Sequence, residues 1–158
     1  MRRPLYFKGK TGGKEKGRKG RASINLTHII EKMKLENLTP EIDVKGIRIT
    51  QPDINRPALP MAGYFEHFEA TRLQIIGFVE YSYIGSMSET KEREVLEALL
   101  SYPIPCIIFC RDLHPDELFR QMAIEKGVPL LLTKKATSAF KAEIIRWLNV
   151  KLAPCISV

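Results

Sequence analysis

The feature that most constrains the fold is the run of residues 106–110, Cys-Ile-Ile-Phe-Cys, which is wholly apolar. A short apolar run of this kind is typical of a central strand that is covered on both faces of a sheet. A second apolar run, 130–132, follows a segment with helical periodicity that ends at Gly127. Two buried strands joined by a helix indicate a parallel, right-handed crossover.

The same alternation extends from residue 73 to the end of the chain. Strand character is predicted over 73–84, where Gly77 marks a bulge or a close backbone approach and 78–83 alternates with Val79, Tyr81 and Tyr83 on one side. Four helices are expected. They run from Ser23 to 35, from the capping-box pattern 86–89 to 102, from Asp112 and Pro115 to 126, and from Thr137 or Ser138 to 152. A half-buried strand is expected at 46–50. We therefore predict an α/β fold, a three-layer sandwich with a mostly parallel sheet.

The net charge of +7 belongs to the N-terminus. Residues 1–22 hold nine Lys/Arg and one Glu, whereas the other 136 residues hold sixteen Lys/Arg and seventeen Asp/Glu. We expect 1–22 to be a disordered basic tail, because it has too few apolar residues to offset the entropy of ordering, and 23–158 to be one domain. The near-neutral domain argues against nucleic acid as a partner, which leaves binding through the tail as a third-ranked hypothesis.

The cysteines, Cys106, Cys110 and Cys155, are expected to be reduced thiols in a cytoplasmic protein. Cys106 and Cys110 lie on one face of a strand and too far apart for a disulfide, and no nearby histidine completes a metal site. No apolar run approaches the ~20 residues needed to span a bilayer, so no membrane partner is expected.

A proline-rich stretch, residues 52–63, interrupts the alternation. Its prolines disfavour a helix interior and a central strand, so we predict a stiff extended segment that presents Asp53, Asn55 and Arg56 as candidate ligand or interface residues. The alternative is structural: Asp53 and Asn55 as turn caps, Arg56 paired with a carboxylate, and Tyr64, Phe65 and Phe68 in the core.

A second candidate site is predicted where strands end. Arg111 follows 106–110, and Thr133 and Lys134 follow 130–132. Ligands bind outside the carboxyl ends of parallel strands, so these residues suit a phosphorylated metabolite or nucleotide, with an ordinary solvated loop as the alternative. The cluster Glu66, His67 and Glu69 suits acid–base chemistry or, more simply, an exposed turn.

Several blocks in order carry a family resemblance. They are Asp53 with Asn55-Arg56-Pro57, Leu59 and Gly63-Tyr64; Arg72-Leu73-Gln74 with Gly77; Pro105-Cys106-Ile107-Ile108 with Arg111; Gly127-Val128-Pro129-Leu130-Leu131 with Thr133; and Leu152-Ala153-Pro154 with Ser157-Val158. From about residue 24 onward, the chain resembles the N-terminal domain of HPr kinase/phosphorylase, the bacterial enzyme that phosphorylates and dephosphorylates a serine of the phosphocarrier protein HPr.

The resemblance implies a regulatory or assembly role in the control of carbon metabolism and carbon catabolite repression. It also implies a fold similar to the first domain of the Mur ligases. The parent enzyme would be a homo-oligomer that uses ATP and Mg²⁺ and acts on HPr. The Gly-rich phosphate loop of the catalytic half has no counterpart here, since residues 12–19 have Arg-Lys where Lys-Ser/Thr is required, so no catalytic or cofactor-binding residue is assigned. We expect a truncated chain, or alternatively a stand-alone module that binds a phosphorylated ligand.

Overall fold

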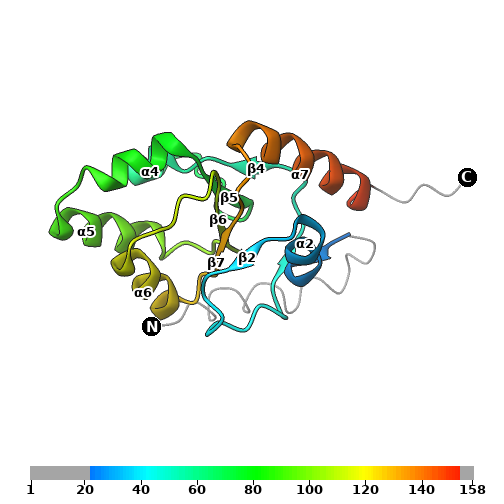
Figure 1. The fold of residues 1–158 in the computed structure, drawn as a ribbon, viewed down its shortest axis with the longest axis horizontal. Coiled ribbons are helices and arrows are strands. Elements are labelled where there is room, and N and C mark those ends of the chain that lie inside the picture. The colour runs from blue at the N-terminus through cyan, green and yellow to red at the C-terminus, as the bar shows by residue number, and fades with distance from the viewer. Residues whose placement is uncertain (1–21, 154–158) are drawn as a thin grey trace, which may run out of the picture.

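The computed structural model describes residues 22–153 (Figure 1). The predicted basic tail therefore lies outside the described residues except for Ala22, as do Cys155 and the closing residues from Pro154. In chain order the first elements are β1 (Ile24–Asn25), α2 (Leu26–Met33), β2 (Glu36–Asn37), β3 (Arg48–Ile49), β4 (Ile54–Asn55) and α3 (Ala58–Met61). They are followed by β5 (Leu73–Ile76), α4 (Phe78–Gly85), α5 (Glu89–Leu99), β6 (Ile107–Phe109), α6 (Glu117–Lys126), β7 (Leu130–Leu132) and α7 (Thr137–Lys151).

The main sheet has five strands in the order β2-β7-β6-β5-β4. Strands β4 to β7 are parallel to one another, and β2 pairs antiparallel with β7 at the edge. The central position of β6 is the one that its wholly apolar sequence predicts. The predicted half-buried strand at 46–50 is confirmed as β3, which pairs with β1 in a small antiparallel sheet and buries Ile49 while Arg48 stays exposed.

Helices cover both faces of the main sheet, so the predicted three-layer α/β architecture is confirmed (Figure 1). Alternate residues of the β6 region separate the two cores. Cys106, Ile108 and Cys110 pack with the buried faces of α2 and α7, whereas Ile107 and Phe109 pack with those of α5 and α6. Each large apolar side chain buried in this way contributes about 1.5–3 kcal/mol relative to exposure.

The prediction of a strand over 78–83 is wrong, because these residues form the helix α4. The chain leaves β5 at Gly77, and the Glu80 carboxylate accepts a hydrogen bond from the Gly77 N–H at 2.8 Å. This contact satisfies a donor at the helix N-terminus and favours a helical turn. The apolar alternation was misleading because Phe78, Val79 and Tyr83 lie on the exposed side of the helix.

Four predicted helix starts are displaced. The side-chain caps are Asn25 for α2, Ser88 for α5 and Asp116 for α6, in place of Ser23, Ser86, and Asp112 with Pro115. Helix α7 begins at Thr137 after Ala136, and no side chain caps it. Each capping oxygen must reach an amide two or three residues onward, and several nearby residues share that chemistry, so the choice among them depends on where the preceding strand or loop ends.

The proline-rich stretch is only partly extended. Residues 54–55 form the edge strand β4, but Ala58–Met61 make the single helical turn α3. Pro60 is accommodated because an amide in a first turn has no intrahelical partner to lose. Tyr64 is exposed, and Phe65 is half-buried and stacks on Tyr102. Phe68 is half-buried and packs against the core, so the expected core role holds in part and for Phe68 alone.

Within residues 22–153, no helix is both long enough and apolar enough to cross a membrane.

Candidate functional site

The carboxyl ends of β5, β6 and β7 meet at one edge of the sheet. The loops that leave β6 and β7 are joined there by backbone hydrogen bonds. The Arg111 N–H donates to the Lys135 carbonyl at 2.8 Å, and the Asp112 N–H donates to the Thr133 carbonyl at 2.9 Å. The structure therefore brings the predicted residues Arg111, Thr133 and Lys134 to the same edge, as parallel strands require.

An ion pair between Arg56 and Glu80 lies at the neighbouring part of this edge. The Arg56 guanidinium, which follows β4, donates from Nε to Glu80 Oε2 at 2.9 Å and from Nη2 to Glu80 Oε1 at 2.8 Å. The Glu80 side chain is 2% exposed and that of Arg56 is 34% exposed. Charge-assisted, bidentate pairs of this kind fix geometry strongly, so the prediction that Arg56 pairs with a carboxylate is confirmed.

Gly77 is required at this position because side chains approach its backbone closely. A Cβ atom there would lie 2.7 Å from Arg56 Nη2 and 2.7 Å from Thr137 Oγ1. The backbone of Gly77 is extended, with φ −107°, so the constraint is steric and not conformational. Arg56, Gly77 and Thr137 therefore form one tightly packed unit that joins β4, α4 and α7.

Beneath this unit lies the Cys110 thiol, which is fully buried. Burial raises the pKa of Cys110 to about 11, although the Thr137 hydroxyl and the Arg56 charge both act to lower it. The thiol is thus neutral at physiological pH and is not an activated nucleophile. Among the described residues no group forms a hydrogen bond of acceptable geometry with the buried Thr137 Oγ1.

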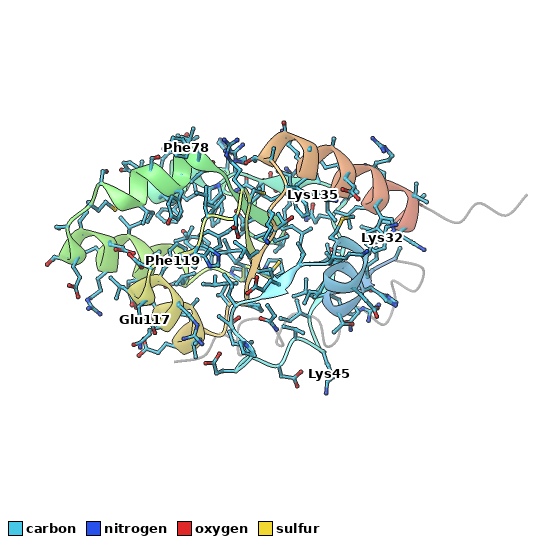
Figure 2. The ribbon with its side chains drawn as sticks, in the orientation of Figure 1. Lys32, Lys45, Phe78, Glu117, Phe119 and Lys135 are labelled. Atoms are coloured by element: carbon cyan, nitrogen blue, oxygen red, sulfur yellow. The ribbon has the colours of Figure 1, made fainter. Side chains whose placement is uncertain are left out.

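The edge also borders an open, basic hollow of about 560 Å³. It is formed by the end of α2, by β2, by the end of β7 and by α7, and Figure 2 shows Lys32 and Lys135 near one another on this side. Its charged lining residues are Lys32, Lys34, Lys134, Lys135, Glu36 and Glu143. Lys135 is paired with Glu143, so the remaining lysines give the hollow its positive character.

Backbone strain is concentrated in the loop that follows β6. Arg111 and Asp112 are consecutive residues with φ values of 58° and 57°. This left-handed conformation is unfavourable for residues other than glycine, although Asp tolerates it better than Arg. The hydrogen bonds to the loop after β7 hold Arg111 and Asp112 in this conformation. The loops after β6 and β7, which we call the rim, are therefore rigidly positioned.

Two of the predicted site residues are placed elsewhere. Asp53 lies before β4, at the amino end of the strands, where its carboxylate is 3.6 Å from Arg72 and accepts from the Ile54 N–H. The Asn55 amide donates to Gln74 Oε1 at 2.9 Å, and the buried Gln74 in turn donates to loop carbonyls. Asp53 and Asn55 therefore bind within the fold and do not join the basic rim.

Sequence reasoning missed Glu80, whereas it gave Gly77 as a bulge or a close backbone approach and Thr137 as the start of a helix without bringing the two together. The spacing Gly77-x-x-Glu80 is that of an N-cap glycine followed by an N3 glutamate, and it would have indicated the start of a helix. The apolar alternation through the same residues favoured a strand and concealed this spacing. No sequence pattern marks the packing of Thr137 against Gly77, because the two residues are 60 positions apart.

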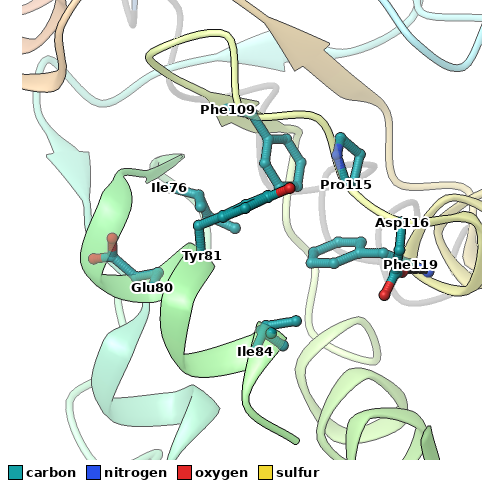
Figure 3. A pocket seen from close by; sticks show the side chains of 9 residues that line it. Ile76, Glu80, Tyr81, Ile84, Phe109, Pro115, Asp116 and Phe119 are labelled. Atoms are coloured by element: carbon teal, nitrogen blue, oxygen red, sulfur yellow. Dashed lines mark hydrogen bonds between the residues drawn. The ribbon is translucent and has the colours of Figure 1, made fainter.

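A separate apolar cavity of about 220 Å³ lies between α4 and the start of α6 (Figure 3). Ile76, Ile84, Phe109 and Phe119 supply much of its lining, and Tyr81 crosses it to donate a hydrogen bond to the His114 carbonyl at 2.7 Å. The wall of this cavity is largely hydrocarbon, and its polar lining residues are Glu80, Tyr81 and Asp116.

Next to this cavity, Glu92 is buried on α5. Burial, and then the nearby Asp116 carboxylate, raise the pKa of Glu92 to about 7.

The predicted cluster around His67 is exposed. The His67 side chain is 81% exposed in a turn beside Glu66, as the simpler interpretation of that cluster expected. Across 22–153, no group of three or more His, Cys, Asp and Glu side chains is placed to hold a metal ion.

The fold and this edge define an α/β domain with an open, mostly parallel sheet whose basic rim lies at the carboxyl ends of the parallel strands. A family model described as "HPr Serine kinase N terminus" matches residues 24–148. The chain belongs to this family, as the sequence blocks predicted.

Named relatives support the same assignment. The HPr kinase/phosphorylase of Lachnoclostridium phytofermentans is 50% identical over 136 residues, which cover 86% of this chain and 44% of that protein. The protein of the same name from Caldicellulosiruptor bescii is 36% identical over 129 residues, which cover 82% of this chain and 42% of that protein. The chain therefore spans less than half the length of these curated relatives and aligns with their N-terminal family region.

A solved structure shares the fold. The CBS and DRTGG domains of the regulatory region of Clostridium perfringens pyrophosphatase, crystallised with the activator diadenosine tetraphosphate, match with a TM-score of 0.51. The match covers 85% of this chain and 52% of that chain at 11% identity. At this identity the likeness concerns the architecture alone.

Proposed function

We propose that this chain acts as a non-catalytic regulatory or assembly domain of a bifunctional HPr(Ser) kinase/phosphorylase, a cytoplasmic enzyme that controls carbon metabolism. The observation that carries the proposal is the family match over residues 24–148 in a chain that corresponds to 44% of its Lachnoclostridium relative. The parent enzyme would use ATP and Mg²⁺, act on HPr and form a homo-oligomer.

The chemistry of the described residues supports a non-catalytic role. Phosphoryl transfer needs backbone amides that cradle the phosphates and a lysine and Mg²⁺ that neutralise the developing charge. The sequence contains no Gly-x-x-x-x-Gly-Lys-Ser/Thr segment. The best-defined charged groups at the rim are already paired, Arg56 with Glu80 and Lys135 with Glu143, and the buried Cys110 is a neutral thiol.

The proposal is tested by transplanting the domain. The Lachnoclostridium enzyme is compared with a chimera that carries residues 24–148 of this chain in the matching region, and with a deletion of that region. The chimera should keep kinase and phosphorylase activity on HPr together with the native assembly, while the deletion should change the assembly or the response to metabolites. The full 158-residue chain alone, given HPr, ATP and Mg²⁺, should transfer no phosphate. Phosphoserine on HPr from this chain, or a deletion without effect, would contradict the proposal.

A second function, the binding of a phosphorylated metabolite or nucleotide, is favoured by the basic hollow and the rigid rim beside it. Lys32, Lys34 and Lys134 line the hollow, and Arg111 is fixed next to it through the Lys135 carbonyl. Several cations around an open hollow suit a polyanionic phosphate group better than an apolar ligand.

This second function predicts a measurable thermal shift. Inorganic pyrophosphate or ATP should raise the melting temperature of the full chain, and the double substitution of Arg111 and Lys134 with Ala should abolish the shift. Lys45→Ala serves as the control, since Lys45 is an exposed lysine on another part of the surface (Figure 2). A shift that persists in the double variant would refute the site.

A further inference from the structure

An uncharged apolar surface covers the outer side of α3 and α4. Among the described residues, six large hydrophobic side chains are exposed, and five of them belong to this region. We name this set the α3–α4 surface: Leu59 (61% exposed), Tyr64 (47%), Phe78 (58%), Val79 (65%) and Tyr83 (39%). Helices α3 and α4 contact each other, and Tyr64 is tied to Leu59 by a backbone hydrogen bond of 2.9 Å.

Charge is nearly absent from the two segments that form this surface. Residues 57–65 and 73–88 contain a single charged residue, Glu80, in a chain in which 27% of residues are charged. Glu80 is buried beneath the surface in its pair with Arg56. Solvated protein surfaces normally carry many charges, so a charge-free, aromatic-rich area is typical of a surface that another protein covers.

Helix α4 has the composition of a helix that is buried on all sides. Tyr81 and Ile84 pack against the core, while Phe78, Val79 and Tyr83 project outward. A surface helix of a monomer normally opposes its apolar face with a polar one, whereas a helix that is apolar all round is buried. The outward residues between the apolar ones are small and uncharged, Ser82 and Ser86.

We infer that the α3–α4 surface is a self-association interface whose occupant is the same surface of a second copy of this chain. In a two-fold, isologous contact each patch meets itself, and a charged patch would then face like charge. No charged residue is among the five that form this surface, and the two that border it have opposite charge: Glu66, which accepts a hydrogen bond from the Tyr64 hydroxyl at 3.3 Å, and Arg56, which is 34% exposed beside Gly77. The inference rests on the proposed assembly role and specifies where the assembly occurs.

The available area agrees with a dimer. At roughly 200 Å² for a fully exposed large side chain, the five exposed fractions leave about 500 Å² of side-chain surface on each copy. A standard stable interface buries about 800 Å² per partner, so these side chains would supply more than half of it before any backbone or neighbouring residue is added.

Sedimentation equilibrium of the full chain tests the inference. The wild type should be a dimer with a dissociation constant in the micromolar range. The double variant F78S/V79S should dimerise at least 30-fold more weakly, because it removes the two largest apolar contributions of α4. The control is Val150→Ser, which alters the sixth exposed hydrophobic residue, 69% exposed on α7, and should leave the dissociation constant within two-fold.

A second variant distinguishes loss of the interface from misfolding of the F78S/V79S variant. Val79→Arg places the same charge on both copies and should yield a monomer with an unchanged circular dichroism spectrum. A wild-type chain that stays monomeric at 100 μM, or variants that dimerise as the wild type does, would overturn the inference. Either result leaves the HPr assays of the chimera unaffected, so the absence of catalysis by this chain is judged independently.

Discussion

The ion pair between Arg56 and Glu80 gives the sharpest test of how the rim is held together. Three hydrogen bonds converge on the Glu80 carboxylate: two from the Arg56 guanidinium and one from the Gly77 N–H. The pair links the residue after β4 to the first turn of α4. Its loss should therefore loosen both elements and the packing of Gly77.

The two single substitutions should differ because the two side chains differ in exposure. Arg56→Ala leaves the Glu80 carboxylate, 2% exposed, without its counter-charge, so we expect a loss of about 3–5 kcal/mol in the free energy of unfolding. Glu80→Ala leaves the Gly77 N–H without its acceptor, but the guanidinium is 34% exposed and can turn to water, so the loss should be smaller, about 1–3 kcal/mol.

Urea denaturation of the single variants and of the R56A/E80A double variant would measure these effects. The double-mutant cycle should give a coupling energy on the order of 2 kcal/mol. Arg93→Ala is a matched control, because Arg93 pairs with Glu89 at 3.1 Å but both side chains are more than half exposed, and its loss should be below about 0.5 kcal/mol. A coupling near zero, or a Glu80→Ala loss larger than that of Arg56→Ala, would refute the reasoning.

Two further predictions concern the same domain. Gly77→Ala should lower the free energy of unfolding by about 1–3 kcal/mol, because its Cβ would meet Arg56 and Thr137, whereas Gly85→Ala, with open space around it, should be neutral or stabilising in thermal melts. The raised pKa of Glu92, about 7 when folded, means that protonation favours the folded state. Wild-type stability should thus fall as pH rises from 5.5 to 8.5, and Glu92→Gln should remove on the order of 1 kcal/mol of that fall; identical pH profiles would exclude the effect.

Much of the fold follows from the sequence because buried strands and helices have strong local patterns. The apolar run through Ile107 and Phe109 requires cover on both faces, and the structure places it at the centre of the sheet between two helical layers. Gly127 ends α6 with φ 74°, a conformation that glycine adopts freely, as its position after the helical pattern predicted.

Local pattern failed where the same residues suited two structures. Residues 78–83 alternate as a strand would, yet they form α4, because Glu80 caps the helix and the outward apolar residues are left exposed. A strand prediction assumes that the apolar residues are buried, whereas Phe78 and Val79 lie on the outer surface of the fold.

The candidate site divides in the same way. The sequence alone determined that Arg111 and Thr133 follow neighbouring strands, and parallel pairing then places them at one edge. Only the tertiary structure decided that Asp53 lies at the other end of the strands, that Asn55 binds Gln74, and that the charge of Arg56 is taken up by Glu80.

The physical reason is the range of the interactions. Strand and helix patterns arise from neighbours a few residues apart, so the sequence carries them directly. Two contacts join segments that are distant in the sequence: Thr137 approaches Gly77, 60 residues away, and Arg56 pairs with Glu80, 24 residues away. These contacts, and the choice of which side of α4 is exposed, exist only once the three layers have packed.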